Sequence, residues 1–219
     1  MQRAQKLSHA MQLADLKSRW QRLFVDFKVE TTLTNQVFSE IVKLYSRNER
    51  YYHNLLHIQR VLDVANTLKS LAINFHAIEI AAWFHDVIYD PQANDNEEKS
   101  AKFASDSLIS FNVPQTTINC VVSLILQTQN HHAPLENIDS QILLDADLSI
   151  LGVEGLDYMA YARSIRQEYC WLSETEYQAG RKRVLRDFLE RDRIYFTEKA
   201  FQMFELKARG NIIAELSTL

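Results

Sequence analysis

Apolar side chains recur every three or four residues along nearly the whole chain, which is the spacing of an amphipathic α-helix. No segment of strand length shows sustained two-residue alternation, and four glycines and three prolines leave few points where a helix must break. The pattern shows no internal repeat or linker. It predicts one all-α domain over residues 1–219, with helices over residues 13–27, 34–45, 54–68, 78–86, 95–108, 114–128, 140–151, 156–169, 173–191 and 197–216.

Polar residues at the starts of these segments predict where several helices begin. Thr34 precedes the second apolar stripe and is a candidate N-cap, because its hydroxyl can accept a hydrogen bond from a free backbone N–H. Asp95 with Glu98, and Ser173 with Glu176, have the spacing of a capping box.

The composition is that of a soluble globular protein, with 47% hydrophobic and 24% charged residues among 219. The net charge of −4 and the pI near 6.0 argue against a surface that binds a nucleic-acid polymer. No apolar run approaches the roughly 18 residues of a membrane span, and the N-terminal region lacks the apolar core of a signal peptide. We therefore expect a cytoplasmic protein with no membrane partner. Cys120 and Cys170 lack metal-ligand spacing and are expected in the core.

One adjacent pair, His85-Asp86, stands out within the apolar stretch AIEIAAWFHDVIYD. An ionised carboxylate is rarely buried unless it is paired or bound to a metal. Neighbouring helical positions project about 100° apart, so both side chains can face one ion only at a helix end, which the polar loop from Asp90 provides. Each residue alone has an ordinary structural explanation, but together with partners elsewhere they indicate a metal site. The available partners are His53, His57, His131, Asp145 and Asp147.

Three stretches, YHNLLHIQRVLDVA, AAWFHDVIYD and LLDADLSILG, resemble the HD superfamily of metal-dependent phosphohydrolases. That family is named for a metal-binding His…His-Asp…Asp set on an all-α bundle. The longer stretches RYYHNLLH, FHDVIYDPQANDNEEKSA, DADLSILG, IRQEY and GRKRVLRDFL resemble a subfamily of predicted HD phosphohydrolases, from about Tyr45 to Tyr195. The resemblance implies an HD-type bundle with a core over about residues 45–155 and C-terminal helices, 154–219, packed on it.

The resemblance also implies a ligand set for a divalent metal ion: His57, His85, Asp86 and Asp147. His57 is preferred to His53 by the HxxxV pattern that follows it, and Asp147 is preferred to Asp145 by the stretch ADLSIL. Imidazole with carboxylate suits Mn, Fe, Ni, Co or Zn, and Mg is a further candidate for phosphoryl chemistry. His131 leaves a second metal open.

The implied activity is hydrolysis of a phosphomonoester or phosphoanhydride in a small phosphorylated metabolite, with a nucleotide favoured, by a metal-activated water. Asp86 would be both a ligand and a group that orients the water. Glu97 would act as a general acid or base if its loop folds over the metal. On the sequence alone, the favoured explanation is that it complements the positive N-terminus of its helix. The candidate substrate contacts are His53, Arg50, Lys99, His131 and Arg181. Arg50 and Lys99 could instead be solvated surface cations.

Two other functions remain compatible with the same residues. Some HD proteins use a second metal to activate dioxygen, so a di-iron oxygenase is the alternative enzyme. A sensor or binding module that retains the metal without turnover is the non-enzymatic alternative. The metal, the substrate and the oligomeric state are left open by the sequence.

Overall fold

The computed structural model describes residues 2–219, with side chains from Ala10 onward. This part of the chain is an all-α bundle without a strand, which confirms the predicted fold class. Its elements are α1 (Gln2–Leu23), α2 (Thr31–Tyr45), α3 (Leu55–Leu68), η1 (Lys69–Leu71), α4 (Phe75–Phe84), α5 (Asn96–Ser110), α6 (Gln115–Gln127), α7 (Ile138–Asp147), η2 (Leu148–Gly152), α8 (Gly155–Glu168), α9 (Glu174–Glu190) and α10 (Glu198–Leu216), where η denotes a 3₁₀ helix. None of these helices is long and apolar enough to cross a membrane.

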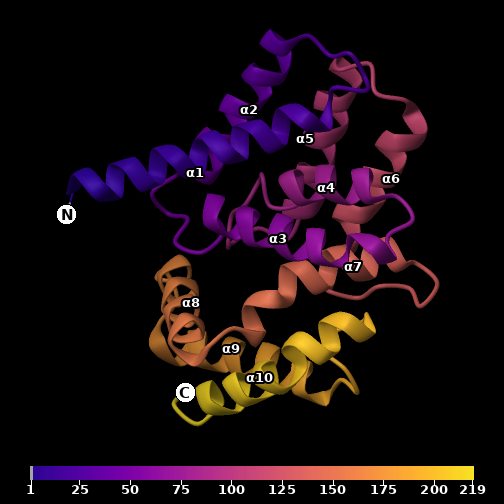
Figure 1. The fold of residues 1–219 in the computed structure, drawn as a ribbon. Helices are drawn as coiled ribbons and strands as arrows, with labels where there is room; N and C mark the ends of the chain where they lie inside the picture. The colour runs from indigo at the N-terminus through magenta and orange to yellow at the C-terminus, as the bar shows by residue number, and fades with distance from the viewer. Residues whose placement is uncertain (1) are drawn as a thin grey trace.

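Helices α3, α4 and α7 lie side by side in the middle of the bundle (Figure 1). Helices α1, α2, α5 and α6 cover one side of them, and α8, α9 and α10 form the opposite end of the molecule (Figure 1). Segments far apart in the sequence therefore meet along α3, α4 and α7.

Helix α4 is central because its last five residues, Ile80 to Phe84, are apolar on every face, and such a segment is stable only when neighbours cover all of it. All of its residues from Ile80 to Phe84 are buried. Trp83 meets the ring of Trp20 edge to face at 5.5 Å, and Trp20 in turn donates to the carbonyl of Thr34 at 2.8 Å. These contacts fix the helix from which the His85-Asp86 pair emerges.

The C-terminal helices hold the end of α7 in place. At Gly152 the backbone of η2 runs so close to α10 that a Cβ would stand 2.6 Å from the Cβ of Phe204, which only glycine avoids. Tyr195 donates its hydroxyl to the carbonyl of Leu148 at 2.9 Å. The residue before Leu148 is Asp147, so this packing sets the position of a predicted ligand.

Side-chain capping was predicted correctly at one helix start, that of α9, and wrongly at the starts of α2 and α5. The capping box of Ser173 and Glu176 is present in both directions. Thr34 is not an N-cap: α2 begins one turn earlier, at Thr31, and the buried Thr34 hydroxyl donates back to the Thr31 carbonyl at 3.0 Å. Asp95 takes the N-cap position of α5 but its side chain makes no cap hydrogen bond, so the capping box predicted with Glu98 is absent. Its carboxylate pairs with Lys99.

The prediction that the cysteines lie in the core was wrong. Both Cys120 and Cys170 are exposed. Cys120 lies on the outward face of α6, whose buried face carries Ile118 and Val121, and Cys170 lies just beyond the end of α8.

Candidate metal centre

The structure brings the four predicted ligands together from the ends of three helices. His57 lies in the first turn of α3, whose start is fixed by Asn54 accepting a hydrogen bond from the Leu56 amide. Helix α4 ends at Phe84, so His85 and Asp86 lie at the helix end and turn toward the same point. Asp147 is the last residue of α7. The helix boundary expected from the adjacent His-Asp pair is therefore present.

The donor atoms of the four residues converge on one point, with one atom from each lying within 4.8 Å of all the others. The Nε2 atom of His57 lies 3.2 Å from Nε2 of His85, 3.4 Å from Oδ2 of Asp86 and 3.3 Å from Oδ1 of Asp147. The Nε2 atom of His85 lies 3.2 Å from Asp86 Oδ2 and 3.6 Å from Asp147 Oδ1.

This geometry fits a single divalent ion. Imidazole and carboxylate ligands bind such ions at about 2.0–2.2 Å, so donors that share one ion lie about 3.0–3.6 Å from one another. The Nδ1 atom of His85 lies 3.0 Å from the carbonyl of Ala82, and donation to that carbonyl leaves the Nε2 lone pair for the cluster. The imidazoles of His57 and His85 are buried, which also suits a site that excludes bulk water.

The carboxylates of Asp86 and Asp147 are stabilised in their charged form by the positive charge that faces them. Burial alone would raise the pKa of Asp147 and of Asp86, but the facing imidazoles outweigh it and hold both pKa values well below the ordinary range. Burial would likewise lower the pKa of His85, yet the charge of Asp86 and hydrogen bonds to both carboxylates raise it well above the ordinary value. Protons on the imidazoles or a divalent ion can therefore neutralise the carboxylates, and metal binding displaces those protons.

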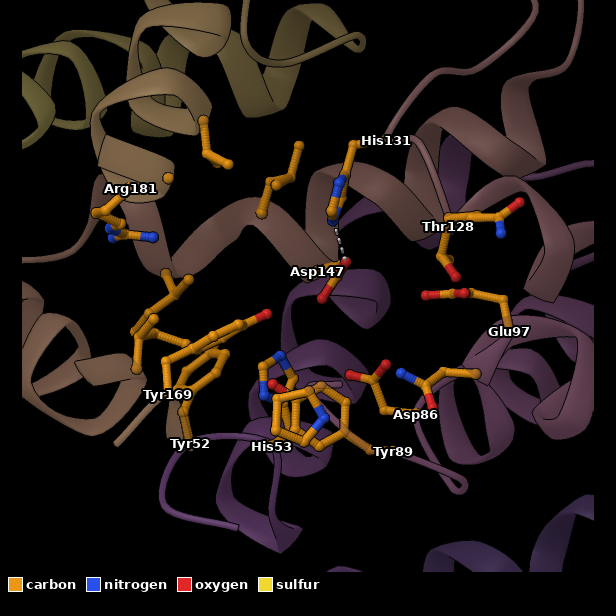
Figure 2. Close-up of a pocket in the computed structure, with 18 of the residues that line it drawn as sticks. Tyr52, His53, Asp86, Tyr89, Glu97, Thr128, His131, Asp147, Tyr169 and Arg181 are labelled. Carbon is orange, nitrogen blue, oxygen red and sulfur yellow. Dashed lines mark ion pairs between the residues drawn. The ribbon is translucent and has the colours of Figure 1, made fainter. Parts of the chain in front are cut away.

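A cavity of about 660 Å³ opens over the cluster, with His85, Asp86 and Asp147 in its wall. Figure 2 shows Asp86 and Asp147 facing this cavity. The cavity extends to two sides of these residues. The side that we call the polar arm contains Asp90, Asn96, Glu97, Thr128 and His131. The side that we call the tyrosine arm contains Tyr52, Tyr169 and, at its end, Arg181 (Figure 2). We assign to it Tyr161, which contacts Tyr52 and Arg181, and the lining residues close to these in sequence, Ile165, Leu172 and Val184.

Glu97 and His131 lie in the polar arm, as expected for site-lining residues. Glu97 is half-buried, and burial raises its pKa, which makes the carboxyl easier to protonate. His131 directs Nε2 toward Asp147, with 3.4 Å to Oδ2 (dashed in Figure 2). Its φ of 48° lies in the left-handed region, and its carbonyl accepts a hydrogen bond from Arg191. Asp147 thus faces His57 and His85 with one oxygen and His131 with the other.

The three predicted cationic contacts are placed differently. Arg50 is buried outside the cavity wall and donates to the backbone carbonyls of His53, Asp86 and Val87, so it braces the turn that follows α4. Lys99 is exposed, pairs with Asp95 at 2.7 Å and does not line the cavity. Arg181 does line the cavity, but its guanidinium forms an ion pair with the carboxylate of Glu215.

The last sequence-predicted contact, His53, is held by a glutamate that sequence reasoning did not single out. Glu168 is buried and accepts from the backbone amides of Tyr52 and His53, at 2.7 and 3.0 Å. Its second oxygen lies 2.6 Å from Nδ1 of His53 and 3.1 Å from the hydroxyl of Tyr89, whose ring stacks on the imidazole at 4.1 Å. The only sequence signal was an acidic residue within the stretch IRQEY.

Comparisons of the chain with protein-family models, with curated proteins and with solved structures found no match. The geometry of the site is therefore the basis for the functional argument.

Proposed function

We propose that the protein is a metal-dependent phosphohydrolase of the HD type that acts on a small phosphorylated metabolite such as a nucleotide. The observation that carries the proposal is the convergence of two imidazoles and two carboxylates beside a cavity large enough for a small metabolite, with His85, Asp86 and Asp147 in its wall. The general-acid and general-base candidates His53 and Glu97 line the same cavity.

His57, His85, Asp86 and Asp147 would hold the ion. A divalent ion there would lower the pKa of a water toward neutrality and polarise a phosphoryl oxygen. Oδ2 is the Asp86 oxygen that lies nearest to both imidazoles, so Oδ1 would be left to accept a hydrogen bond from the attacking water. Glu97, which lines the polar arm of the same cavity, would take up the proton that this water releases.

His53 is the proposed proton donor for the leaving oxygen. Glu168 occupies Nδ1, so the other ring nitrogen, Nε2, is the one left for the cavity that His53 lines. The His53 ring centre lies 5.8 Å from that of His57, which places it beside the cluster. Stacking on Tyr89 and the bond to Glu168 limit rotation of the ring, and a fixed donor contributes more to proton transfer than a mobile one.

The test is elemental analysis of the purified protein, followed by a phosphate-release screen over nucleotides and other phosphate esters with Mn, Co, Ni and Mg. We expect bound metal and release of inorganic phosphate. His85→Ala and Asp86→Ala should abolish both. His132→Ala is the matched control, because this exposed histidine lies beside His131 but outside the cavity wall and should change neither. Activity that survives in either ligand variant would rule out this centre.

A di-iron oxygenase is the second candidate, favoured by one observation. Asp147 faces the cluster with Oδ1 and His131 with Oδ2, so its carboxylate would offer a ligand atom on each side if His131 held a second ion. Two irons per chain without phosphate release would favour the oxygenase. Bound metal without either reaction would favour a sensor or binding module.

A further inference from the structure

The two arms of the cavity differ in chemistry, and this difference bears on which phosphorylated compound fits. Figure 2 shows Tyr52, Tyr169 and Arg181 on one side of Asp147, and Glu97 with Thr128 on the other. The tyrosine arm is therefore the apolar side of the cavity, and the polar arm is the acidic side.

The walls of the tyrosine arm are aromatic and aliphatic. The rings of Tyr52 and Tyr161 meet edge to face at 4.7 Å, and Ile165 and Val184 add aliphatic surface. Tyrosine rings offer apolar faces and edges that pack against flat groups. This arm is thus suited to the organic part of a substrate whose phosphoryl group lies at the metal centre.

Positive charge is scarce along the cavity wall. Of the described residues that line it, Arg181 and Arg183 carry the arginine and lysine charges. The buried Arg181 is already neutralised by Glu215, with its Nε and Nη2 donating at 2.8 and 3.0 Å. Arg183 is exposed at the rim, which leaves it to face solvent as much as a ligand.

The charge balance at the centre therefore sets a limit on the substrate. One bound divalent ion would leave the carboxylates of Asp86 and Asp147 formally neutralised, so a phosphoryl dianion would add two negative charges. A second phosphate would add more negative charge beside Glu97, with no unpaired arginine or lysine among the lining residues except the exposed Arg183. Enzymes that cleave polyphosphates neutralise that charge with cationic side chains and metal ions.

We propose that the substrate is a phosphomonoester of an alcohol that carries an aromatic or similarly flat apolar group, and that phosphoanhydrides are excluded. This inference rests on the proposed phosphohydrolase function and narrows it. In the reaction, water adds to phosphorus, the P–O bond to the alcohol breaks, and the alcohol oxygen takes up a proton. Nucleoside monophosphates fit this class through their bases, whereas nucleoside triphosphates and pyrophosphate do not.

The first test measures binding without turnover. Isothermal titration of the Mn-loaded protein compares phenylphosphonate with methylphosphonate, which have the same charge and differ in the ring. We expect phenylphosphonate to bind at least about tenfold more tightly, because the tyrosine arm removes its ring from water. Equal affinities, or tighter binding of pyrophosphate than of phenylphosphonate, would overturn the inference.

The second test uses rates. Benzyl phosphate, which carries a ring but leaves as an alkyl alcohol like glycerol, should be hydrolysed with at least about a tenfold higher kcat/KM than glycerol 3-phosphate. Nucleoside triphosphates and pyrophosphate should not be hydrolysed. Release of phosphate from the anhydrides at comparable rates would overturn the inference and leave the phosphohydrolase standing. Release from none of the four compounds would overturn the proposed function, and the inference with it.

The variant Val184→Asp tests whether the preference for an aromatic substrate arises in the tyrosine arm. Val184 is 43% exposed, so the fold should tolerate aspartate there, but the carboxylate would lie in the tyrosine arm. We expect KM for benzyl phosphate to rise about tenfold, and more than KM for glycerol 3-phosphate. The control is Leu206→Asp on α10, 88% exposed and outside the cavity wall, which should leave both values unchanged. Equal changes in the two KM values for Val184→Asp would contradict the proposed location.

Discussion

Helix α7 presents two aspartates, two residues apart, to opposite regions of the molecule. Asp145 faces the segment before α10 and accepts hydrogen bonds from the backbone amides of Phe196 and Thr197, at 2.7 and 2.8 Å. Asp147 faces the cavity, and its nearest side-chain polar neighbours are the imidazole nitrogens of His57, His85 and His131.

The two aspartates differ in the groups that neutralise or hydrogen-bond their carboxylates. Asp145 is satisfied by donors that belong to the chain, so it has no need of an ion. Asp147 is surrounded by groups that can offer lone pairs as readily as protons, so a metal ion can satisfy all of them at once. A buried carboxylate is thus evidence for a ligand only after the chain's own donors have been counted.

The largest expected effect comes from removing the carboxylate that lacks such donors. Asp147→Ala should lower metal affinity by about a hundredfold or more, because it removes one of four ligands and the anion that compensates the ion. Adding Mn should raise the melting temperature of the wild type but not of this variant, and a chelator should reverse the increase. Calorimetry and thermal unfolding measure both.

Asp145→Asn is the matched control for that experiment. It keeps one oxygen acceptor outside the cluster, so metal affinity should stay near the wild-type value even if stability falls. Loss of metal binding in this variant as large as in Asp147→Ala would mean that the two aspartates do not divide their roles in this way.

The next largest effect is on folding. Asp145→Ala should reduce the free energy of unfolding by about 3 kcal/mol, because the amides of Phe196 and Thr197 lose their acceptors where Asp145 and Thr197 are buried. Urea unfolding of the metal-free protein measures this loss. In the same assay Asp147→Ala should change stability less, and a larger loss there would reverse the proposed division of roles.

The helices were predictable because their signal is local. The 3.6-residue period is carried by consecutive residues, so every predicted helix is present. Helix starts were less predictable, since a cap depends on which hydrogen bond a side chain makes: Ser173 accepts one from the backbone, whereas Thr34 donates within its first turn. The prediction for the cysteines was wrong because it used the average tendency of cysteine to be buried. The position of a residue on the buried or the exposed face of its helix outweighs that tendency.

The site was predictable only where a motif carried it. His85 and Asp86 draw attention as a polar pair in an apolar stretch, and the resemblance to the HD pattern selected Asp147 over Asp145. Arg50 was selected by nearness in sequence, but its guanidinium is taken up by backbone carbonyls. Glu168 could not be selected, because its partner His53 lies 115 residues away and no local period links them.

Glu168 is a third carboxylate in this comparison. Like Asp145 it accepts hydrogen bonds from backbone amides, and like Asp147 it lies beside the cavity. Burial alone would raise its pKa, but hydrogen bonds from the His53 ring and from the amides of His53 and Tyr52 hold it below the ordinary value of 4.5. Because the pKa is lower in the folded state, ionised Glu168 stabilises the fold fully above the unfolded-state pKa. That contribution is lost as the pH falls toward the folded-state value.

Glu168→Gln should therefore lower the free energy of unfolding by about 1–2 kcal/mol at neutral pH, and the difference from wild type should shrink as the pH falls below about 4. Urea unfolding of the metal-free proteins across this pH range is the measurement. A difference independent of pH would show that the shape of the side chain matters and its charge does not, which would group Glu168 with neither aspartate. A difference that fades in acid would show that a carboxylate beside the cavity can be satisfied by the chain's own donors. Asp147 would then differ from Asp145 in lacking such donors, and its position at the cavity would not be sufficient to make it a ligand.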